Sequence, residues 1–281
     1  MRLSIITINL DNREGLEHTL RSVFEQTNGD CEGIVVDGLS NDGSRDVIAA
    51  YQKQIHKWVS EKDSGIFNAM NKGIRMAEGE YLLFLNSGDY LYSPDTLNRV
   101  FKHQFSEDFV VFDIELVGKG GREVRRVEKD PREILILGEI FHQAVLHRRS
   151  IFQELGLYDE TFKVAADYKL FLKAFFTAGC SCRVIHEVLS VYDNIYGLSS
   201  DIRNAGLVHQ ERRKAQRSVL TPELVDALEE HYREIESLRR FKSLYEGLLA
   251  SKTVKAALCV SGVLRRIRMV LGRKTPNSGA G

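Results

Sequence analysis

The stretch from residue 60 to residue 89 constrains the fold of this chain more than any other. It starts with the end of a short strand, continues as an amphipathic helix, and closes with a strand of large apolar residues at 81–85. The helical stripe recurs at a spacing of three and four residues and comprises Ile66, Ala69, Met70, Gly73, Ile74 and Ala77. An apolar strand without alternation is typical of a sheet that is covered on both faces. The stretch therefore predicts an α/β protein with a parallel sheet.

The residues before this stretch repeat the alternation of strands and helices. The predicted elements are strands at 3–8, 33–36 and 58–60 and helices at 14–24 and around 47–55. The polar residues that follow the successive strands are Asn9, Asp37, Asp63 and Asp89. A turn-forming role explains any one of them, but the carboxyl ends of parallel strands share one edge, where ligands bind. Four such residues in register favour a binding site.

The second half of the chain continues the same domain. The predicted elements are a helix at 95–105, a strand at 109–112, a hairpin within 116–127, a short helix at 151–156, a helix from Asp167 to Gly179 and a strand at 183–192. Taken alone, Asp167 is better explained as the N-cap of its helix than as a catalytic carboxylate. His142, taken alone, is more often a hydrogen-bonded structural histidine than a ligand.

Two glycine-rich phosphate-binding motifs are missing from the sequence. The turn after the first strand, at 9–15, has no GxGxxG pattern, and GxxxxGK[ST] does not occur either. A bound diphosphate would need another source of positive charge. A divalent cation held by a carboxylate is the obvious candidate.

Composition and charge narrow the class of protein. With 281 residues the chain can bury one large core, or one core plus an appendage, and its formal net charge of zero gives no argument for nucleic acid. The cysteines, expected as free thiols in a reducing compartment, are Cys31, Cys180, Cys182 and Cys259. We expect no signal peptide, and no apolar run reaches the ~20 residues of a spanning helix. These features predict a cytoplasmic protein.

Five segments together resemble the inverting glycosyltransferases of family 2, which have the GT-A fold. They are SIITINLDNREGLEHTLRSVFEQ, IVVDGLSNDGSRDVI, VSEKDSGIFNAMNKGIRMAEGEYLLFLNSGD, FHQAVLHRRS and VAADYKLFLKAF. The most specific part is Asp-x-Gly-Ile-(aromatic)-x-Ala-Met-Asn-Lys-Gly followed by Phe-Leu-Asn-Ser-Gly-Asp. The resemblance covers residues 1 to about 200. Within the family the chain is most similar to enzymes that build bacterial exopolysaccharide, O-antigen or capsule, including the colanic acid branch.

The resemblance implies a role for each matching position. The positions that would bind the nucleotide sugar are Thr7, Asn9, Asp37, Asp63 and Asn71. Among these, Asp37 typically faces the base. Asp89 matches the last acid of the metal-binding motif, and Asp167 matches the catalytic base that deprotonates the acceptor hydroxyl. His142 and Gln143 match a pair near the acceptor or the diphosphate, which adds His142 to the catalytic candidates.

Two departures from the family pattern concern the metal and the base. Members often carry Asp-x-Asp-Asp where this chain has Asn-Ser-Gly-Asp at 86–89, which leaves a single carboxylate. They often carry Glu-Asp where this chain has Ala-Asp at 166–167. The resemblance still implies a divalent cation, Mg²⁺ or Mn²⁺, on Asp89, with an affinity that depends on the diphosphate of the substrate.

Residues 201–281 are predicted as a helical extension of a catalytic domain formed by residues 1–200. Thr221 and Pro222 suit the start of a helix that runs to about Leu249. The segment 251–275 has seven Lys and Arg residues and no acid, interleaved with apolar residues, which suits an anionic membrane surface. The alternative is a helix that packs on the catalytic domain. We expect disorder from about residue 276.

The sequence therefore predicts a glycosyltransferase that moves a sugar from a nucleotide-sugar donor to a saccharide acceptor with inversion, in cell-surface polysaccharide biosynthesis. The expected acceptor is linked to polyprenyl diphosphate, which places the protein peripherally at the inner face of the cell membrane. One alternative, a sugar-nucleotide nucleotidyltransferase, would need a glycine-rich basic loop after the first strand. The other is a catalytically inactive nucleotide-sugar-binding or scaffold subunit of a polysaccharide assembly complex.

Overall fold

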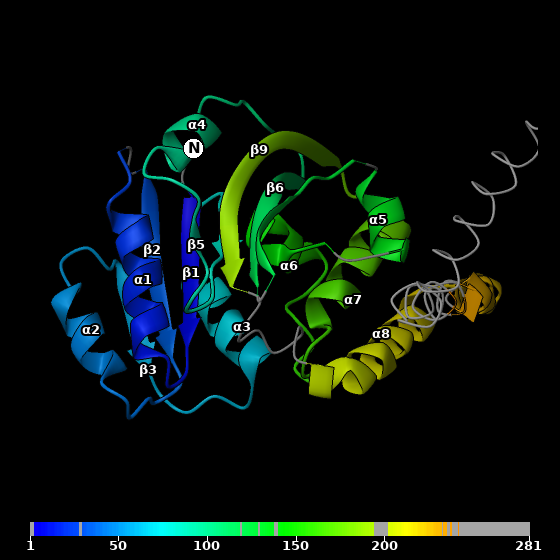
Figure 1. Ribbon diagram of the computed structural model, residues 1–281, viewed down its shortest axis with the longest axis horizontal. Coiled ribbons are helices and arrows are strands. Elements are labelled where there is room, and N and C mark those ends of the chain that lie inside the picture. The colour runs from blue at the N-terminus through cyan, green and yellow to red at the C-terminus, as the bar shows by residue number, and fades with distance from the viewer. Residues whose placement is uncertain are drawn as a thin grey trace, which may run out of the picture. The chain divides into compact units, whose positions relative to one another are not determined.

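The computed structural model describes residues 3–27, 30–118, 120–128, 130–137, 140–193 and 202–231, together with 233, 234, 237 and 241. The chain divides into two compact units, Met1–Pro222 and Glu223–Gly281. In the first unit, helices lie around a strongly curled sheet (Figure 1). The predicted α/β fold class is therefore confirmed.

The sheet follows the order β3-β2-β1-β4-β8-β6-β9-β5, and β7 pairs with β6. The strands are β1 (Leu3–Asn9), β2 (Cys31–Asp37), β3 (Lys57–Ser60), β4 (Tyr81–Phe84), β5 (Tyr90–Leu91), β6 (Phe109–Gly118), β7 (Gly121–Arg125), β8 (Val145–Arg148) and β9 (Cys182–Asp193). The first four strands in the order pair in parallel, as do β6 and β9, whereas β8 is antiparallel to both of its neighbours. Parallel ladders hold most of the paired residues, so the sheet is mainly parallel.

The helices connect the strands in the right order for βαβ units. They are α1 (Arg13–Phe24), α2 (Ser44–Ala50), α3 (Ile66–Met76), α4 (Thr96–Val100), α5 (Pro131–Leu137), α6 (Ser150–Glu154), α7 (Ala166–Leu172) and α8 (Ala205–Val219), with short turns η1 (His142–Ala144), η2 (Lys173–Thr177) and η3 (Ile202–Asn204). Helix α3 packs on β1 and β2 through its apolar stripe. At Gly73 the helix backbone approaches β1 so closely that an added Cβ would lie 2.4 Å from Cγ2 of Ile6.

Several boundaries differ from those predicted, for local reasons. Helix α2 begins after Gly43, whose φ of +93° is left-handed, and no side chain caps it. Helix α4 ends at Val100, so it is about half as long as predicted, and the next two residues form a turn. Helix α7 continues into the π-helical turn η2. Gly179, at φ +68°, then ends the helical segment, as predicted.

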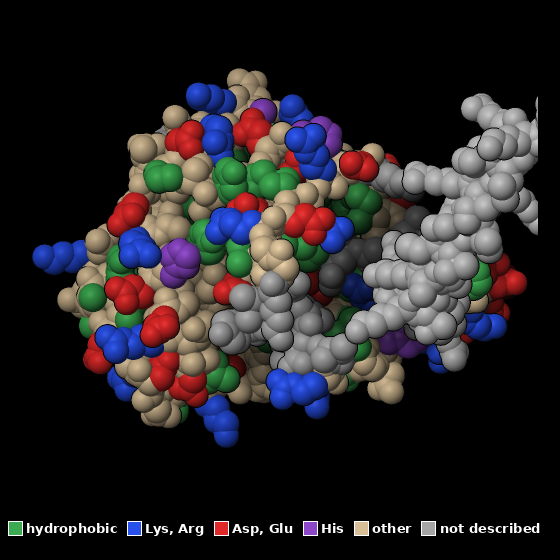
Figure 2. Space-filling view, in the orientation of Figure 1, with side chains coloured by type: hydrophobic (Ala, Val, Ile, Leu, Met, Phe, Trp, Pro, Cys, Tyr) green, Lys and Arg blue, Asp and Glu red, His purple; other side chains and the backbone are tan. Residues whose placement is uncertain are grey.

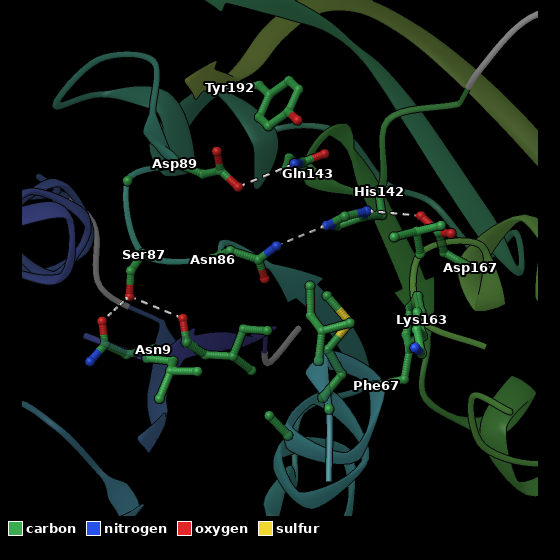
Figure 3. A pocket seen from close by; sticks show the side chains of 18 of the residues that line it. Asn9, Phe67, Asn86, Ser87, Asp89, His142, Gln143, Lys163, Asp167 and Tyr192 are labelled. Atoms are coloured by element: carbon green, nitrogen blue, oxygen red, sulfur yellow. Dashed lines mark hydrogen bonds and ion pairs between the residues drawn. The ribbon is translucent and has the colours of Figure 1, made fainter. Parts of the chain in front are cut away.

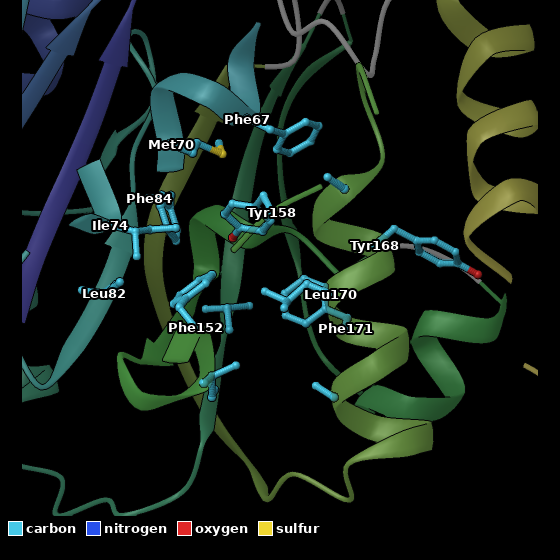
Figure 4. Packing of buried hydrophobic residues seen from close by; sticks show 14 of the residues in the cluster. Phe67, Met70, Ile74, Leu82, Phe84, Phe152, Tyr158, Tyr168, Leu170 and Phe171 are labelled. Carbon is cyan, nitrogen blue, oxygen red and sulfur yellow. The ribbon is translucent and has the colours of Figure 1, made fainter. Parts of the chain in front are cut away.

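An aromatic cluster fills the core between the sheet and α7 (Figure 4). The rings of Phe84, Phe152 and Tyr158 pack edge to face at centroid distances of 5.4–6.1 Å. His147 on β8 is fully buried against Phe84 and Phe171. Burial lowers the pKa of His147 to about 3, so this imidazole is neutral and acts as a core residue. The cluster fixes α7 against the strands that border the site.

The second unit is described only over a short helical stretch. Residues 222–231 are helical, which agrees with the start predicted after Thr221. The predicted end of that helix near Leu249, the basic segment 251–275 and the tail from 276 lie outside the described residues. No helix in the described part of the chain combines the length and the apolar composition needed to cross a bilayer.

Candidate active site

A cavity of about 840 Å³ lies at the carboxyl ends of β1, β2 and β4. One side is formed by the turns that follow these strands and by the start of α3, and the opposite side by η1, α7 and α8. Five of the predicted site residues line it, namely Asn9, Asp63, Asp89, His142 and Asp167. Figure 3 shows most of these side chains pointing into one space from different elements. The strand-end pattern of the sequence therefore did locate a cavity.

Asn9 and Asp37 form a polar network beneath the cavity. Asn9 Nδ2 donates to Asp37 Oδ1 at 2.8 Å, and Ser87 Oγ donates to Asn9 Oδ1 at 2.7 Å. Asp37 also accepts from the hydroxyls of Ser40 and Ser60, and it is completely buried. Burial alone would raise the pKa of Asp37, but the hydrogen bonds from Ser40, Ser60 and Asn9 outweigh it and lower the pKa. Asp37 is thus a buried anion that fixes the strand ends.

Three predicted nucleotide ligands do not line the cavity: Thr7, Asp37 and Asn71 are buried below it. Asn71 on α3 donates to the carbonyl oxygen of Tyr158 at 2.9 Å and to Glu160 Oε1 at 2.8 Å, and it accepts from the Tyr158 amide at 3.0 Å. Asn71 thus ties α3 to the segment that leads into α7, and the nucleotide-binding roles of Thr7, Asp37 and Asn71 stay predictions.

Asp63 and Asp89 face the cavity in different surroundings. Lys72 forms an ion pair with Asp63 at 2.7 Å, so that carboxylate already has a cationic partner. Asp89 is only 4% exposed and accepts a hydrogen bond from Gln143 Nε2 at 3.2 Å. Burial raises the pKa of Asp89 to about 7, although His142 and the Gln143 hydrogen bond oppose the rise. A bound cation would therefore stabilise the ionised form of Asp89.

His142 and Asp167 form a pair on the other side of the cavity. His142 Nδ1 lies 3.0 Å from Asp167 Oδ2, and His142 Nε2 lies 3.4 Å from Asn86 Nδ2 (Figure 3). Because a carboxylate oxygen accepts hydrogen bonds, His142 donates from Nδ1 to Asp167. The N-cap of α7 is Ala165, not Asp167, which instead accepts from the Tyr168 amide at 2.8 Å. The cap interpretation of Asp167 is therefore wrong.

Further residues of the site carried no clear signal in the sequence. Lys163 and Arg212 line the cavity near Asp167, and the Arg212 guanidinium lies over the Tyr168 ring at 5.2 Å from its centroid. Arg212 lies beyond residues 1 to about 200, which carry the family resemblance. Lys163 lies in a loop without a motif. Folding alone brings Arg212 close to Asp167, which lies more than forty residues earlier in the chain.

The family comparison identifies the class of protein that has this site. The model of "Glycosyl transferase family 2" matches residues 4–187, from β1 into β9. The chain belongs to glycosyltransferase family 2. The matched region of this family 2 glycosyltransferase contains every predicted site residue, and α8 lies outside it.

Curated relatives of this family 2 glycosyltransferase are named for glycan synthesis. The PGL/p-HBAD biosynthesis glycosyltransferase of Mycobacterium tuberculosis is 32% identical over 206 residues, which are 71% of this chain and 79% of the relative. The putative teichuronic acid biosynthesis glycosyltransferase TuaG of Bacillus subtilis is 39% identical over 90 residues, 31% of this chain and 36% of the relative. The chain is similar to both proteins.

Solved structures of low sequence identity share the fold. TarS 1-349 from S. aureus in complex with UDP-GlcNAc has a TM-score of 0.63 at 17% identity, over 81% of this chain and 70% of that one. The mannosyltransferase PcManGT from Pyrobaculum calidifontis, in complex with GDP-Man and Mn²⁺, has a TM-score of 0.57 at 14% identity, over 97% of this chain and 88% of that one. These likenesses support the GT-A fold of the glycosyltransferase.

The donor set of the cavity fits a divalent cation that is completed by its substrate. No three His, Cys, Asp or Glu side chains of the described residues gather as a metal site. Asp89 supplies one carboxylate at the cavity wall, and in the described structure Asn86 Oδ1 is a buried oxygen without a hydrogen-bond partner. Hard cations take oxygen ligands and, for Mg²⁺ in particular, often only one or two from protein carboxylates, the rest from phosphates and water.

Proposed function

We propose that this glycosyltransferase transfers a sugar from a nucleotide-sugar donor to a saccharide acceptor with inversion at the anomeric carbon. The observation that carries the proposal is the placement of Asp89 and the His142–Asp167 pair on one cavity. Inverting transfer needs a group that stabilises the departing diphosphate and a separate base that takes the proton of the acceptor. The cavity offers one carboxylate for each task.

On the donor side, the proposed site lies along the ends of β1 and β4. Asn9, Asp63 and the turn at 86–89 border the space where the nucleotide diphosphate would lie. Asp89 is the residue that would hold Mg²⁺ or Mn²⁺, and the bound cation would neutralise charge that develops on the diphosphate. Thr7, Asp37 and Asn71 support this site from below.

On the acceptor side, Asp167 is the proposed base and His142 is its partner. The Nδ1–H of His142 points at Asp167 Oδ2, which fixes the carboxylate, while Oδ1 is held by the Tyr168 amide. The acceptor hydroxyl transfers its proton to Asp167 as its oxygen attacks the anomeric carbon from the face opposite the diphosphate. A single displacement inverts the centre and requires no covalent enzyme intermediate.

For the cellular role, we propose synthesis of a bacterial cell-surface glycan of the exopolysaccharide, O-antigen or colanic acid type. Support comes from the relatives, whose names refer to PGL/p-HBAD and teichuronic acid biosynthesis. A polyprenyl-diphosphate-linked acceptor and a peripheral position at the cytoplasmic face of the membrane complete the proposal. The basic amphipathic segment 251–275 supports the membrane contact.

The first test is thermal unfolding with UDP, GDP, dTDP, CMP and NAD, each with and without Mn²⁺. A rise in Tm with one nucleoside diphosphate only when Mn²⁺ is present is the expected result, because the diphosphate completes the metal site. Asp89→Asn should remove this Mn²⁺-dependent rise. A rise of equal size without metal would contradict the role of Asp89.

The second test separates the enzyme from an inactive scaffold subunit. The matching nucleotide sugar is incubated with the full chain, Mn²⁺ and a membrane extract that supplies acceptors, and release of the nucleoside diphosphate is measured. We expect the wild-type chain to release the nucleoside diphosphate and the Asp167→Asn variant to release far less. Nucleotide binding without any release would favour the scaffold.

A further inference from the structure

Helix α8 borders the site although it lies beyond residues 4–187, which the family model matches. It packs along α7, the helix that carries Asp167 (Figure 1). It also contributes Val208 and Arg212 to the wall of the cavity. An element outside the shared family region therefore forms part of the end of the cavity that holds Asp167.

Glu211 on α8 makes the most direct contact with the loop in front of α7. Glu211 is 7% exposed, and its carboxylate accepts hydrogen bonds from three backbone amides: Lys163 N to Oε1 at 2.8 Å, Val164 N to Oε2 at 2.9 Å and Ala165 N to Oε2 at 3.1 Å. Hydrogen bonds to a carboxylate are roughly twice as strong as neutral ones. Three of them on consecutive residues fix the backbone of this loop.

Two further contacts of α8 hold the same segment on either side of these amides. Gln216 Nε2 donates to the hydroxyl of Tyr168 at 2.9 Å, and Gln216 is almost completely buried. Lys214 Nζ donates to Thr161 Oγ1 at 3.1 Å and lies 4.2 Å from the centroid of the Phe162 ring. The segment 161–168 is thus attached to α8 before, at and after its turn into α7.

We propose that Glu211 is a positioning residue for Asp167, so that α8 is a working part of the active site. The last amide that Glu211 holds belongs to Ala165, the N-cap of α7, two residues before Asp167. Any shift of that amide moves the Asp167 carboxylate relative to His142 and to the acceptor. The inference rests on the proposed function for the role of Asp167, but the attachment of the loop can be measured without it.

A carboxylate is needed at this position because the three amides are all donors. In Glu211→Gln the side chain keeps its size, but one of its two oxygens is replaced by an NH₂ group that meets amide N–H groups. At least one of the three amides then loses its partner, and the loop shifts. A displacement of about 1 Å at a reacting group can cost on the order of 100-fold in rate.

The first experiment measures amide hydrogen exchange of the full chain, which needs neither donor nor acceptor. Glu211→Gln should accelerate exchange of the amides of 163–165 by about tenfold or more, while the peptides that cover β1 and β2 keep their wild-type rates. The exposed neighbour Gln210 provides the matched control, because Gln210→Ala should leave 163–165 protected. Unchanged exchange at 163–165 in Glu211→Gln would overturn the proposal.

The second experiment measures kcat, the KM of the nucleotide sugar and the stoichiometry of nucleotide binding for the same variants. We expect kcat to fall about 10- to 100-fold in Glu211→Gln while KM and stoichiometry stay within about twofold, because the donor end is intact. A proportional loss of binding-competent protein would indicate a structural role only and would refute the proposal. Should Glu211→Gln fail to fold, Glu211→Asp, whose shorter carboxylate reaches fewer of the amides, replaces it with the same criteria.

The two experiments distinguish a failure of this inference from a failure of the proposed function. If the wild-type chain releases no nucleotide from any donor, the proposed function fails, and the loss of protection at 163–165 still decides whether Glu211 holds the loop. If the wild type turns over and Glu211→Gln keeps kcat within about twofold, Glu211 does not position Asp167 and only this inference fails.

Discussion

Asp37 accepts hydrogen bonds from Asn9, Ser40 and Ser60, and no part of it reaches solvent. Asp89, in the turn between β4 and β5, has Gln143 as its side-chain partner and lies on the cavity wall. The hydrogen bonds lower the pKa of Asp37, whereas burial raises that of Asp89 to about 7. The same residue type at the carboxyl edge of the sheet is thus a structural anion in one case and a candidate ligand in the other.

The environment of Asp37 predicts how the stability that its carboxylate contributes depends on pH. Its lowered pKa means that the carboxylate contributes stability above the unfolded pKa of about 3.9, and that this contribution is lost as pH falls through the folded value. Asp37→Asn should lower the free energy of unfolding by about 1–3 kcal/mol at pH 7, since the amide presents donors to hydroxyl donors. Urea unfolding at pH 7, 4 and 3 measures this. A difference that grows as the pH drops would contradict the prediction.

Asp167→Asn tests the proposed base directly. The amide cannot accept a proton, so we expect kcat to fall by about 10²- to 10⁴-fold, with the donor KM within about twofold. His142→Ala should lower kcat less, because the Tyr168 amide still holds one oxygen of Asp167. Asp130→Asn, on an exposed carboxylate outside the cavity, serves as the control. Near-normal turnover of Asp167→Asn would remove Asp167 from the mechanism.

At the scale of the elements, α3 connects the two walls of the cavity. Its apolar stripe packs on β1 and β2, and Asn71, on the same helix, binds the backbone of Tyr158 and the side chain of Glu160. Lys72 reaches from α3 to Asp63 at the cavity edge. Helix α3 therefore holds the segment that leads into α7 in a fixed place relative to the sheet.

Gly73→Ala tests how closely α3 must approach β1. The added Cβ would lie 2.4 Å from Cγ2 of Ile6, so either the helix or the strand must move. We expect a loss of about 1–3 kcal/mol in the free energy of unfolding, although alanine favours helices intrinsically. Denaturant unfolding gives the value, and Gly206→Ala on α8, where no atom lies near the added Cβ, is the matched control. Equal or higher stability of Gly73→Ala would show that the contact can relax.

At the scale of the whole molecule, positive and negative charges balance, but the segment 251–275 has an excess of positive charge. On the face shown in Figure 2, Lys and Arg side chains of the described residues lie among Asp and Glu side chains, in keeping with a formal net charge of zero. The basic residues of 251–275 have no acids among them. An anionic surface would therefore attract that segment more strongly than the rest of the chain.

Removal of residues 251–281 tests this attraction. The full chain should float with liposomes that contain anionic lipid, and the truncated chain should float markedly less, because each basic residue near the surface contributes about 1 kcal/mol. Raising the salt concentration should weaken flotation of the full chain. Nucleotide-dependent thermal shift confirms that the truncated chain is folded. Equal flotation of both chains would refute membrane binding by this segment.

The sequence by itself determined the order of the elements and the edge of the sheet at which a site forms. Apolar stripes and strands are local patterns. Asn9 ends β1, and Asp63 and Asp89 lie in the turns that follow β3 and β4, which brings all three to the cavity. Tertiary structure alone decided which polar side chains face the cavity. Asp37 and Asp89 look equivalent along the chain, and their partners Ser60 and Gln143 are defined only by folding. The attachment of Glu211 to residues 163–165 is equally non-local, because it joins backbone amides that carry no side-chain signal.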